Sequence, residues 1–175
     1  MCSSDLLAMQ RALAAEPPQQ AALYADAHAA IARAFALPAP ERLLLTSSCT
    51  QALSVLLGNL AWQPGDVVIT SSLEHHALAA PVQKLGDERG VHVVRAAYRP
   101  GQPIDLEQVE TTLRAGRVRL VAVTGASNVT GERLPIAELG ALARAHGAWL
   151  LLDSAQIAGL SPCSVDRKST RLNSS

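Results

Sequence analysis

The chain has 175 residues, of which 49% are hydrophobic, and its 15 lysine and arginine residues balance its 15 aspartate and glutamate residues. This length and apolar content predict one globular domain, or part of one, with a sizeable core. Zero net charge and the lack of basic runs interleaved with aromatic residues argue against nucleic acid or an anionic membrane as a partner, so a small molecule is expected. The three cysteines are Cys2, Cys49 and Cys163. Their spacing matches neither a disulfide framework nor a set of metal ligands, so no metal site is expected.

The expected location is the cytoplasm. No apolar run approaches the roughly 18 residues that span a bilayer, and the first residues lack the order of regions found in a secretory signal. The composition breaks only at the end of the chain, where RKSTRLNSS abandons the Ala/Leu/Val pattern. We therefore expect an N-terminal helical segment over residues 1–40, a main domain over residues 41–166, and a disordered or extraneous tail over residues 167–175.

The predicted elements alternate between helix and strand along the chain. Residues 19–37 form an Ala-rich segment with helical spacing, and the short apolar runs that follow are separated by longer helical patterns. Because these runs are apolar on both faces, they predict an α/β fold with a mostly parallel sheet that helices flank on two sides. The five runs are ERLLLTS (41–47), GDVVITS (65–71), VHVVRA (91–96), VRLVAVTG (118–125) and AWLLLDS (148–154).

Four turns that follow strands in this scheme carry polar side chains. Ligands of such sheets sit beyond the carboxyl ends of the strands, so these turns are the candidate site. Each turn alone has a plain structural interpretation as a helix cap, a solvated helix start or a tight turn. The four motifs are T-S-S-C-T-Q (46–51), E-H-H (74–76), S-N-V-T-G (127–131) and D-S-A-Q (153–156).

Taken in order, the four motifs resemble those of the class V group of pyridoxal-phosphate enzymes, in particular the cysteine desulfurases and their close relatives. The resemblance covers about residues 41–166, and residues 126–159 are its most specific portion. It implies part of the large domain of a fold type I enzyme, with pyridoxal 5′-phosphate as the cofactor. It also implies that the intact parent is a homodimer that acts on a small amino acid, L-cysteine being favoured, and passes sulfur to an acceptor protein.

The resemblance implies a role for each matching residue. Asp153 would hold the protonated pyridine nitrogen, so that the ring remains an electron sink. Gln156 would reach the 3-hydroxyl of the ring, and Asn128 would approach the same side. His75 would stack on the pyridine face and move protons. Two residues of the first turn would cradle the phosphate through backbone N–H groups and a hydroxyl, namely Cys49 and Thr50.

The chain also departs from the family pattern. Ser48 replaces a usual glycine, Gln51 a common glutamate and Gly125 a frequent histidine. The family forms a Schiff base on a lysine about 25 residues past the aspartate, within a Ser/Gly-His-Lys segment, and neither Lys84 nor Lys168 matches that position. The resemblance therefore implies that the chain is a fragment of the parent enzyme and is inactive because the Schiff-base lysine is absent. Cys163 does not match the nucleophilic cysteine of desulfurases, which comes later in the family sequence.

Three functions from different classes remain open at this point. The first is the cofactor-binding part of a cysteine desulfurase, which converts L-cysteine to L-alanine and an enzyme-bound persulfide. The second is another class V reaction, such as transamination, selenocysteine cleavage or epimerisation. The third is a non-catalytic α/β binding module, which the missing lysine favours and the four ordered motifs disfavour.

Overall fold

The computed structural model describes residues 17–37, 39–102 and 104–159. The chain divides into two compact units, Met1–Leu45 and Thr46–Ser175, and each is treated by itself. The predicted tail over residues 167–175 lies outside the described residues, as do Lys168, Cys2 and Cys163. Among the described residues, no helix is both long enough and apolar enough to cross a membrane.

The first unit contains the predicted N-terminal helix. Helix α2 (Pro17–Ala34) begins with two prolines, whose fixed φ suits a first helical turn. The helix starts two residues before the predicted range of 19–37 and ends three residues before its end. A short 3-10 helix, η1 (Pro40–Arg42), follows, and His28 Nε2 on α2 lies 3.0 Å from the carbonyl oxygen of Leu43.

The strand predicted in ERLLLTS (41–47) is wrong. The run begins inside η1, and residues 43–47 form no strand. An apolar run becomes a strand only where it finds a hydrogen-bonding neighbour, and the partners of this segment include the side chain of His28 instead. Leu44 accordingly leaves 67% of its surface exposed.

The second unit contains a sheet of four parallel strands. These are β1 (Val67–Ser71), β2 (His92–Ala96), β3 (Val118–Thr124) and β4 (Trp149–Asp153), in the spatial order β2-β1-β3-β4. All three pairings are parallel, and Thr124 at the end of β3 pairs with Asp153 at the end of β4. The α/β fold with a parallel sheet is thus confirmed, and four of the five predicted strands are present.

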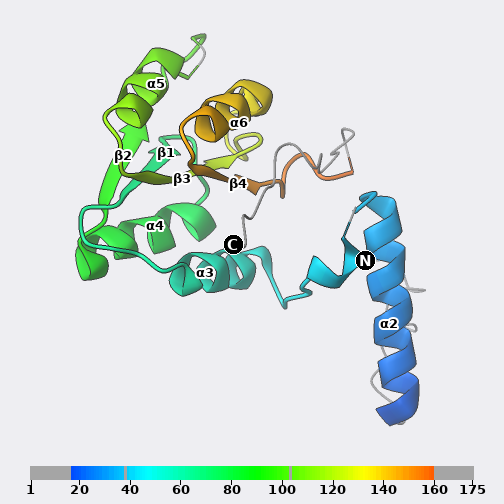
Figure 1. The fold of residues 1–175 in the computed structure, drawn as a ribbon. Coiled ribbons are helices and arrows are strands. Elements are labelled where there is room, and N and C mark those ends of the chain that lie inside the picture. Colours follow the sequence, from blue (N-terminus) through cyan, green and yellow to red (C-terminus); the bar gives the residue numbers. More distant parts are fainter. Residues whose placement is uncertain (1–16, 38, 103, 160–175) are drawn as a thin grey trace. The chain divides into compact units, whose positions relative to one another are not determined.

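Helices cover both faces of this sheet (Figure 1). Helices α3 (Cys49–Asn59) and α4 (His76–Arg89) lie on one face, and α5 (Leu106–Arg114) and α6 (Ile136–Ala145) lie on the other. Each face has its own core, because β1 and β3 are apolar on both sides. Leu57 and Leu78 pack in one core, and Val109 and Leu139 pack in the other.

Helix α6 lies between a proline and a glycine. Pro135 is its N-cap, and Gly147 follows its C-cap with a φ of 71°. This positive φ is a conformation that glycine adopts without the penalty that a Cβ would bring. The chain can therefore reverse at Gly147 and enter β4 two residues later.

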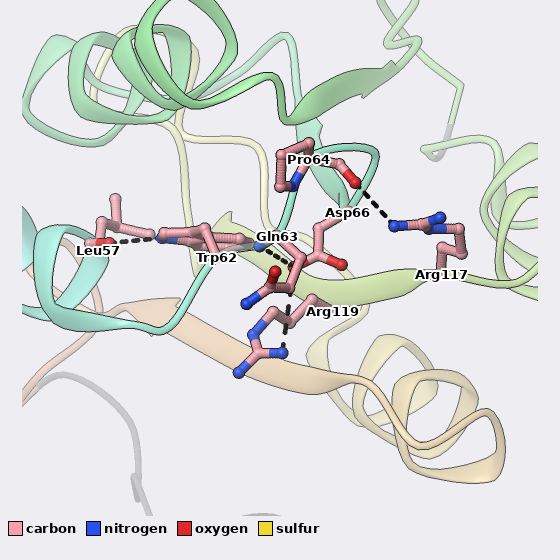
Figure 2. Close-up of polar contacts among 7 residues, drawn as sticks. All are labelled: Leu57, Trp62, Gln63, Pro64, Asp66, Arg117 and Arg119. Carbon is pink, nitrogen blue, oxygen red and sulfur yellow. Dashed lines mark hydrogen bonds and ion pairs between the residues drawn. The ribbon is translucent and has the colours of Figure 1, made fainter.

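The amino edge of the sheet is fixed by a set of polar contacts (Figure 2). The indole nitrogen of Trp62 donates to the carbonyl of Leu57 at 2.7 Å, and Asp66 accepts from the backbone of Gln63 at 2.8 Å. Arg119 on β3 lies 4.0 Å from the Asp66 carboxylate and 5.5 Å from the ring centroid of Trp149. These contacts stabilise the amino ends of the strands. The candidate site residues lie at the opposite, carboxyl ends.

Candidate functional site

Three strands end in buried polar residues at the carboxyl edge of the sheet. Ser71 ends β1, Thr124 ends β3 and Asp153 ends β4, and each is at most 5% exposed. The strands β1, β3 and β4 are consecutive neighbours, so these residues form a row along one edge. The turns that follow β1, β3 and β4 carry three of the four sequence motifs, and the first motif begins α3.

Asp153 is the most buried of the predicted site residues. Its Oδ1 accepts a hydrogen bond from the backbone N–H of Ala155 at 3.0 Å and lies 3.6 Å from the thiol of Cys49. Its backbone carbonyl accepts from the amide of Gly125 at 2.8 Å. Both side-chain contacts go to Oδ1, and Oδ2 receives no hydrogen bond from the residues that the structure describes. One oxygen of a fixed, buried carboxylate is therefore left to accept an external donor.

The first motif forms the N-terminus of α3. Ser48 is the N-cap, and its hydroxyl oxygen accepts from the backbone N–H of Gln51 at 3.1 Å. The Gln51 side chain accepts in return from the backbone N–H and the hydroxyl of Ser47, at 2.9 and 2.8 Å. Cys49 and Thr50 are the first two helical residues, and both are exposed. Their N–H groups lie at the positive end of the helix dipole, where anions are stabilised.

Cys49 joins the first and last motifs across 104 residues of sequence. Burial raises the pKa of its thiol, and the charge of Asp153 and the hydrogen bond to Asp153 raise the pKa further. The residue as a whole is exposed, and its thiol contacts Asp153. A thiol with a raised pKa stays protonated near neutral pH and is a poor nucleophile. Cys49 is therefore suited to donate to Asp153.

Glu74 is a site residue that sequence reasoning did not single out. The hydroxyl of Ser71 donates to Glu74 Oε1, while Glu74 Oε2 is buried without a hydrogen-bond partner among the described residues. Burial raises the pKa of Glu74 to about 7, and the charge of Asp153 adds to the rise. Hydrogen bonding from Ser71 and from the backbone of Thr124 acts in the opposite direction. Glu74 therefore gains or loses its proton near neutral pH.

His75 is the N-cap of α4 and immediately follows Glu74. Its Nδ1 accepts from the backbone N–H of Ala77 at 3.1 Å, which assigns the proton of the neutral ring to Nε2. The residue is exposed, and so is His76 after it. The hydrogen bond fixes the ring of His75 at the carboxyl end of β1 with an exposed face.

Asn128 and Gln156 follow β3 and β4 and are both exposed. Asn128 lies in a turn that the Ser127 hydroxyl holds, because that oxygen accepts from the backbone N–H groups of Val129 and Thr130, both at 3.3 Å. Gln156 lies in the turn after Asp153, where Ile157 N donates to the carbonyl of Ser154 at 3.0 Å. Both side chains are accessible at the predicted edge.

The structure brings only some of the predicted residues into contact. Cys49 and Asp153 touch, whereas Thr50, His75, Asn128 and Gln156 share the edge without a hydrogen bond to either of them. The role of each residue toward a cofactor stays a prediction. Glu74 carried one signal in the sequence, its place directly before the histidines at the end of a strand, but its burial depends on strands that lie far along the chain.

Lys84 does not belong to this edge. It lies on α4 with its side chain 69% exposed and forms a surface ion pair with Glu88 at 3.8 Å. That Lys84 does not match the family lysine stays a prediction. In the part of the chain that the structure describes, no group of three or more His, Cys, Asp or Glu side chains could hold a metal ion.

The comparisons with known proteins identify the class. The family model described as "Aminotransferase class-V" matches residues 8–169, and the chain therefore belongs to the class V aminotransferase family. The match includes all four motifs at the carboxyl edge and confirms the resemblance found in the sequence.

The curated relatives are cysteine desulfurases. A probable cysteine desulfurase of Pseudomonas aeruginosa is 39% identical over 119 residues, which cover 67% of this chain and 29% of that protein. A cysteine desulfurase of Dickeya dadantii is 37% identical over 119 residues, with coverage of 66% and 29%. The chain thus matches less than a third of the length of these relatives.

Solved structures confirm the fold. The apo structure of a cysteine desulfurase from Thermococcus onnurineus superposes with a TM-score of 0.76 at 26% identity, covering 81% of this chain and 35% of that one. The cysteine desulfurase CsdA of Escherichia coli gives the same TM-score and identity, covering 85% and 38%. The four-stranded unit therefore has the fold of part of a class V enzyme.

Proposed function

We propose that this chain is the pyridoxal-phosphate-binding part of a cysteine desulfurase. The observation that carries the proposal is the buried carboxylate of Asp153, fixed at the end of β4 with both contacts on one oxygen. Membership of the class V family and the desulfurase relatives at 37–39% identity support the same conclusion.

The residues present fit this cofactor at two points. A phosphate needs an anion site, and the start of α3 offers the N–H groups of Cys49 and Thr50 together with the hydroxyl of Thr50. A pyridinium nitrogen needs an acceptor, and Asp153 Oδ2 is available for it. When bound, the cofactor would supply an electron sink for the carbanion that forms at the substrate's α-carbon.

Each residue of the edge then has a task. Asp153 would keep the proton on the pyridine nitrogen, and its own position is held by Ala155 and Cys49. His75 would lie against the ring, with the proton on Nε2 directed away from the backbone of Ala77. Asn128 and Gln156 would donate from their amides to the oxygen at the 3-position of the ring.

The complete enzyme would convert L-cysteine to L-alanine and leave the sulfur as a persulfide. The lysine that binds the cofactor and the cysteine that receives the sulfur would come from outside these 175 residues, since the chain matches only 29% of its relatives. We further propose a homodimer in the cytoplasm that passes its sulfur to an acceptor protein. Another class V reaction is the second candidate, because Ser48, Gln51 and Gly125 depart from the residues that are usual at these places and so leave the subgroup open.

The proposal is tested by binding pyridoxine 5′-phosphate, which lacks the aldehyde and cannot form a Schiff base with a surface lysine. With ¹⁵N-labelled ligand, the pyridine nitrogen should stay protonated at pH 8 in the 175-residue chain and lose its proton in Asp153→Asn. Asp87→Asn is the matched control, because Asp87 is an exposed acid on α4 that bonds Gln83 at 2.9 Å. Absent binding, or the same nitrogen shift in all three proteins, would contradict the proposal.

A further inference from the structure

Thr124 has a buried hydroxyl that the proposed function does not use. The residue ends β3 and is 3% exposed. Its hydroxyl donates to the backbone carbonyl of Ala126 at 2.8 Å, and its Oγ1 lies 3.5 Å from the backbone carbonyl oxygen of Asp153. Because a hydroxyl has one proton, the shorter contact is the hydrogen bond and the longer one is secondary. The side chain therefore lies between the turn that follows β3 and the residue that ends β4.

The turn after β3 carries Asn128 and closes on itself. We call residues 125–134 the Asn128 turn. Ala126 and Arg133 face each other across it as an antiparallel bridge, and the backbone hydrogen bonds run between the residues on either side of this pair, at 2.8 and 3.2 Å. Such a pair exchanges no backbone hydrogen bonds of its own, so the bridge leaves the carbonyl of Ala126 to another donor.

The Asn128 turn is joined to the ends of the strands by hydrogen bonds. Gly125 N donates to the carbonyl of Asp153 at 2.8 Å, and the Thr124 hydroxyl donates to the carbonyl of Ala126. The pairing of β3 with β4 ends at Thr124 and Asp153. Ala126 is only 7% exposed, and a buried carbonyl needs a hydrogen-bond donor. The Thr124 hydroxyl supplies that donor where strand pairing has stopped.

We propose that Thr124 is a positioning residue, whose hydroxyl holds the Asn128 turn against the end of β4 and so sets the place of Asn128 relative to Asp153. The inference rests on the proposed function, in which Asn128 meets the oxygen at the 3-position of the ring and Asp153 meets the ring nitrogen. Both atoms belong to one rigid ring, so the ligand needs the two residues at a fixed spacing. Thr124 lies outside all four sequence motifs.

Thr70 provides a matched control for the hydroxyl of Thr124. It lies on the neighbouring strand β1 and is 2% exposed, and its Oγ1 is buried without a hydrogen-bond partner among the residues that the structure describes. Valine has nearly the shape of threonine and lacks the hydroxyl. Thr70→Val therefore removes an unsatisfied polar group, whereas Thr124→Val leaves the buried carbonyl of Ala126 without its donor.

Amide hydrogen exchange in the ligand-free chain tests the hold of Thr124 on the turn. The readout is the exchange rate of Gly125 N, which donates to Asp153, divided by that of Ala148 N, which donates to the carbonyl of Ala143 at 2.9 Å. The ratio cancels a change in global stability. Thr124→Val should raise this ratio by about fivefold or more, whereas Thr124→Ser and Thr70→Val should keep the wild-type value.

Ligand preference tests the consequence for the site. The dissociation constants of pyridoxine 5′-phosphate and of its 3-deoxy analogue, which lacks the ring hydroxyl, give a preference for each protein. Asn128→Ala sets the reference and should lower the preference by about fivefold, the worth of one hydrogen bond. Thr124→Val should lower it equally, and adding Thr124→Val to Asn128→Ala should lower it no further. Thr124→Ser and Thr70→Val should keep the wild-type preference.

The two measurements separate this inference from the proposed function. An unchanged exchange ratio in Thr124→Val would overturn the inference whatever the ligands do. A wild-type preference in Thr124→Val, with a lowered preference in Asn128→Ala, would also overturn it, because Asn128 then finds its place without the hydroxyl. If no protein binds either ligand but Thr124→Val alone raises the exchange ratio, the cofactor assignment fails and the hold of Thr124 on the turn stands.

Discussion

Replacing Gly125 by alanine should test the packing of the two turns that form the site. A Cβ on Gly125 would collide with Ile157 Cδ1 and would lie 2.9 Å from its Cγ1. Ile157 is only half buried and its outer methyl can turn away, but Cγ1 is held closer to the backbone. Overpacking of this kind costs about 1–3 kcal/mol, and the partial freedom of Ile157 places the expected loss at about 1–2 kcal/mol of the unfolding free energy.

Urea unfolding of a double-mutant cycle measures the effect. In the Ile157→Ala background the obstructing atoms are gone, and Gly125→Ala should be neutral or stabilising by a few tenths of a kcal/mol. Gly58→Ala is the control, because nothing lies within 4 Å of a Cβ at this helical position. It should stabilise the chain by up to about 1 kcal/mol. If Gly125→Ala lowers the unfolding free energy equally in the wild type and in Ile157→Ala, the predicted collision with Ile157 is refuted.

Three further predictions concern stability. Folded Glu74 keeps its proton up to about pH 7, whereas its ordinary pKa is 4.5, so the unfolding free energy should fall as the pH rises from about 4.5 to about 7. Urea unfolding at the two pH values should show a fall in the unfolding free energy of at most about 3 kcal/mol for the wild type. The same measurement on Glu74→Gln should show no such fall. Trp62→Phe removes the 2.7 Å hydrogen bond to the Leu57 carbonyl and should cost about 1–3 kcal/mol by thermal unfolding; an unchanged Tm would contradict this role. Ser48→Ala removes the cap on Gln51 N and should cost about 0.5–2 kcal/mol, whereas Ser48→Asp should keep most of the stability.

Most of the sheet could be predicted from the sequence because its strands are apolar on both faces. That pattern follows from the position of β1 and β3 between two layers of helices, and it needs no knowledge of distant residues. The run ERLLLTS has the same local pattern but forms no strand. Pairing depends on a neighbour, which a local pattern does not reveal.

The candidate site was predictable only in part, for a similar reason. Asp153 ends β4 and His75 lies in the turn after β1, as the sequence predicts. The protonation of Glu74 depends on burial and on Asp153, which is 79 positions later in the chain (153 − 74). The contact of Cys49 with Asp153 likewise requires α3 and β4 to meet. Such properties arise from tertiary packing, so no motif carries them.

The central claim is that these residues serve a cysteine desulfurase, and the most direct test is product formation from L-cysteine. The complete enzyme that contains this segment should release L-alanine and, with a thiol reductant, an equal amount of sulfide. Asp153→Ala at matched cofactor loading should lower kcat by about 100-fold or more, because a preorganised charge is lost where the transition state needs it. Equal rates in the two proteins would remove Asp153 from its role, and a wild type that forms no alanine from L-cysteine would contradict the desulfurase assignment.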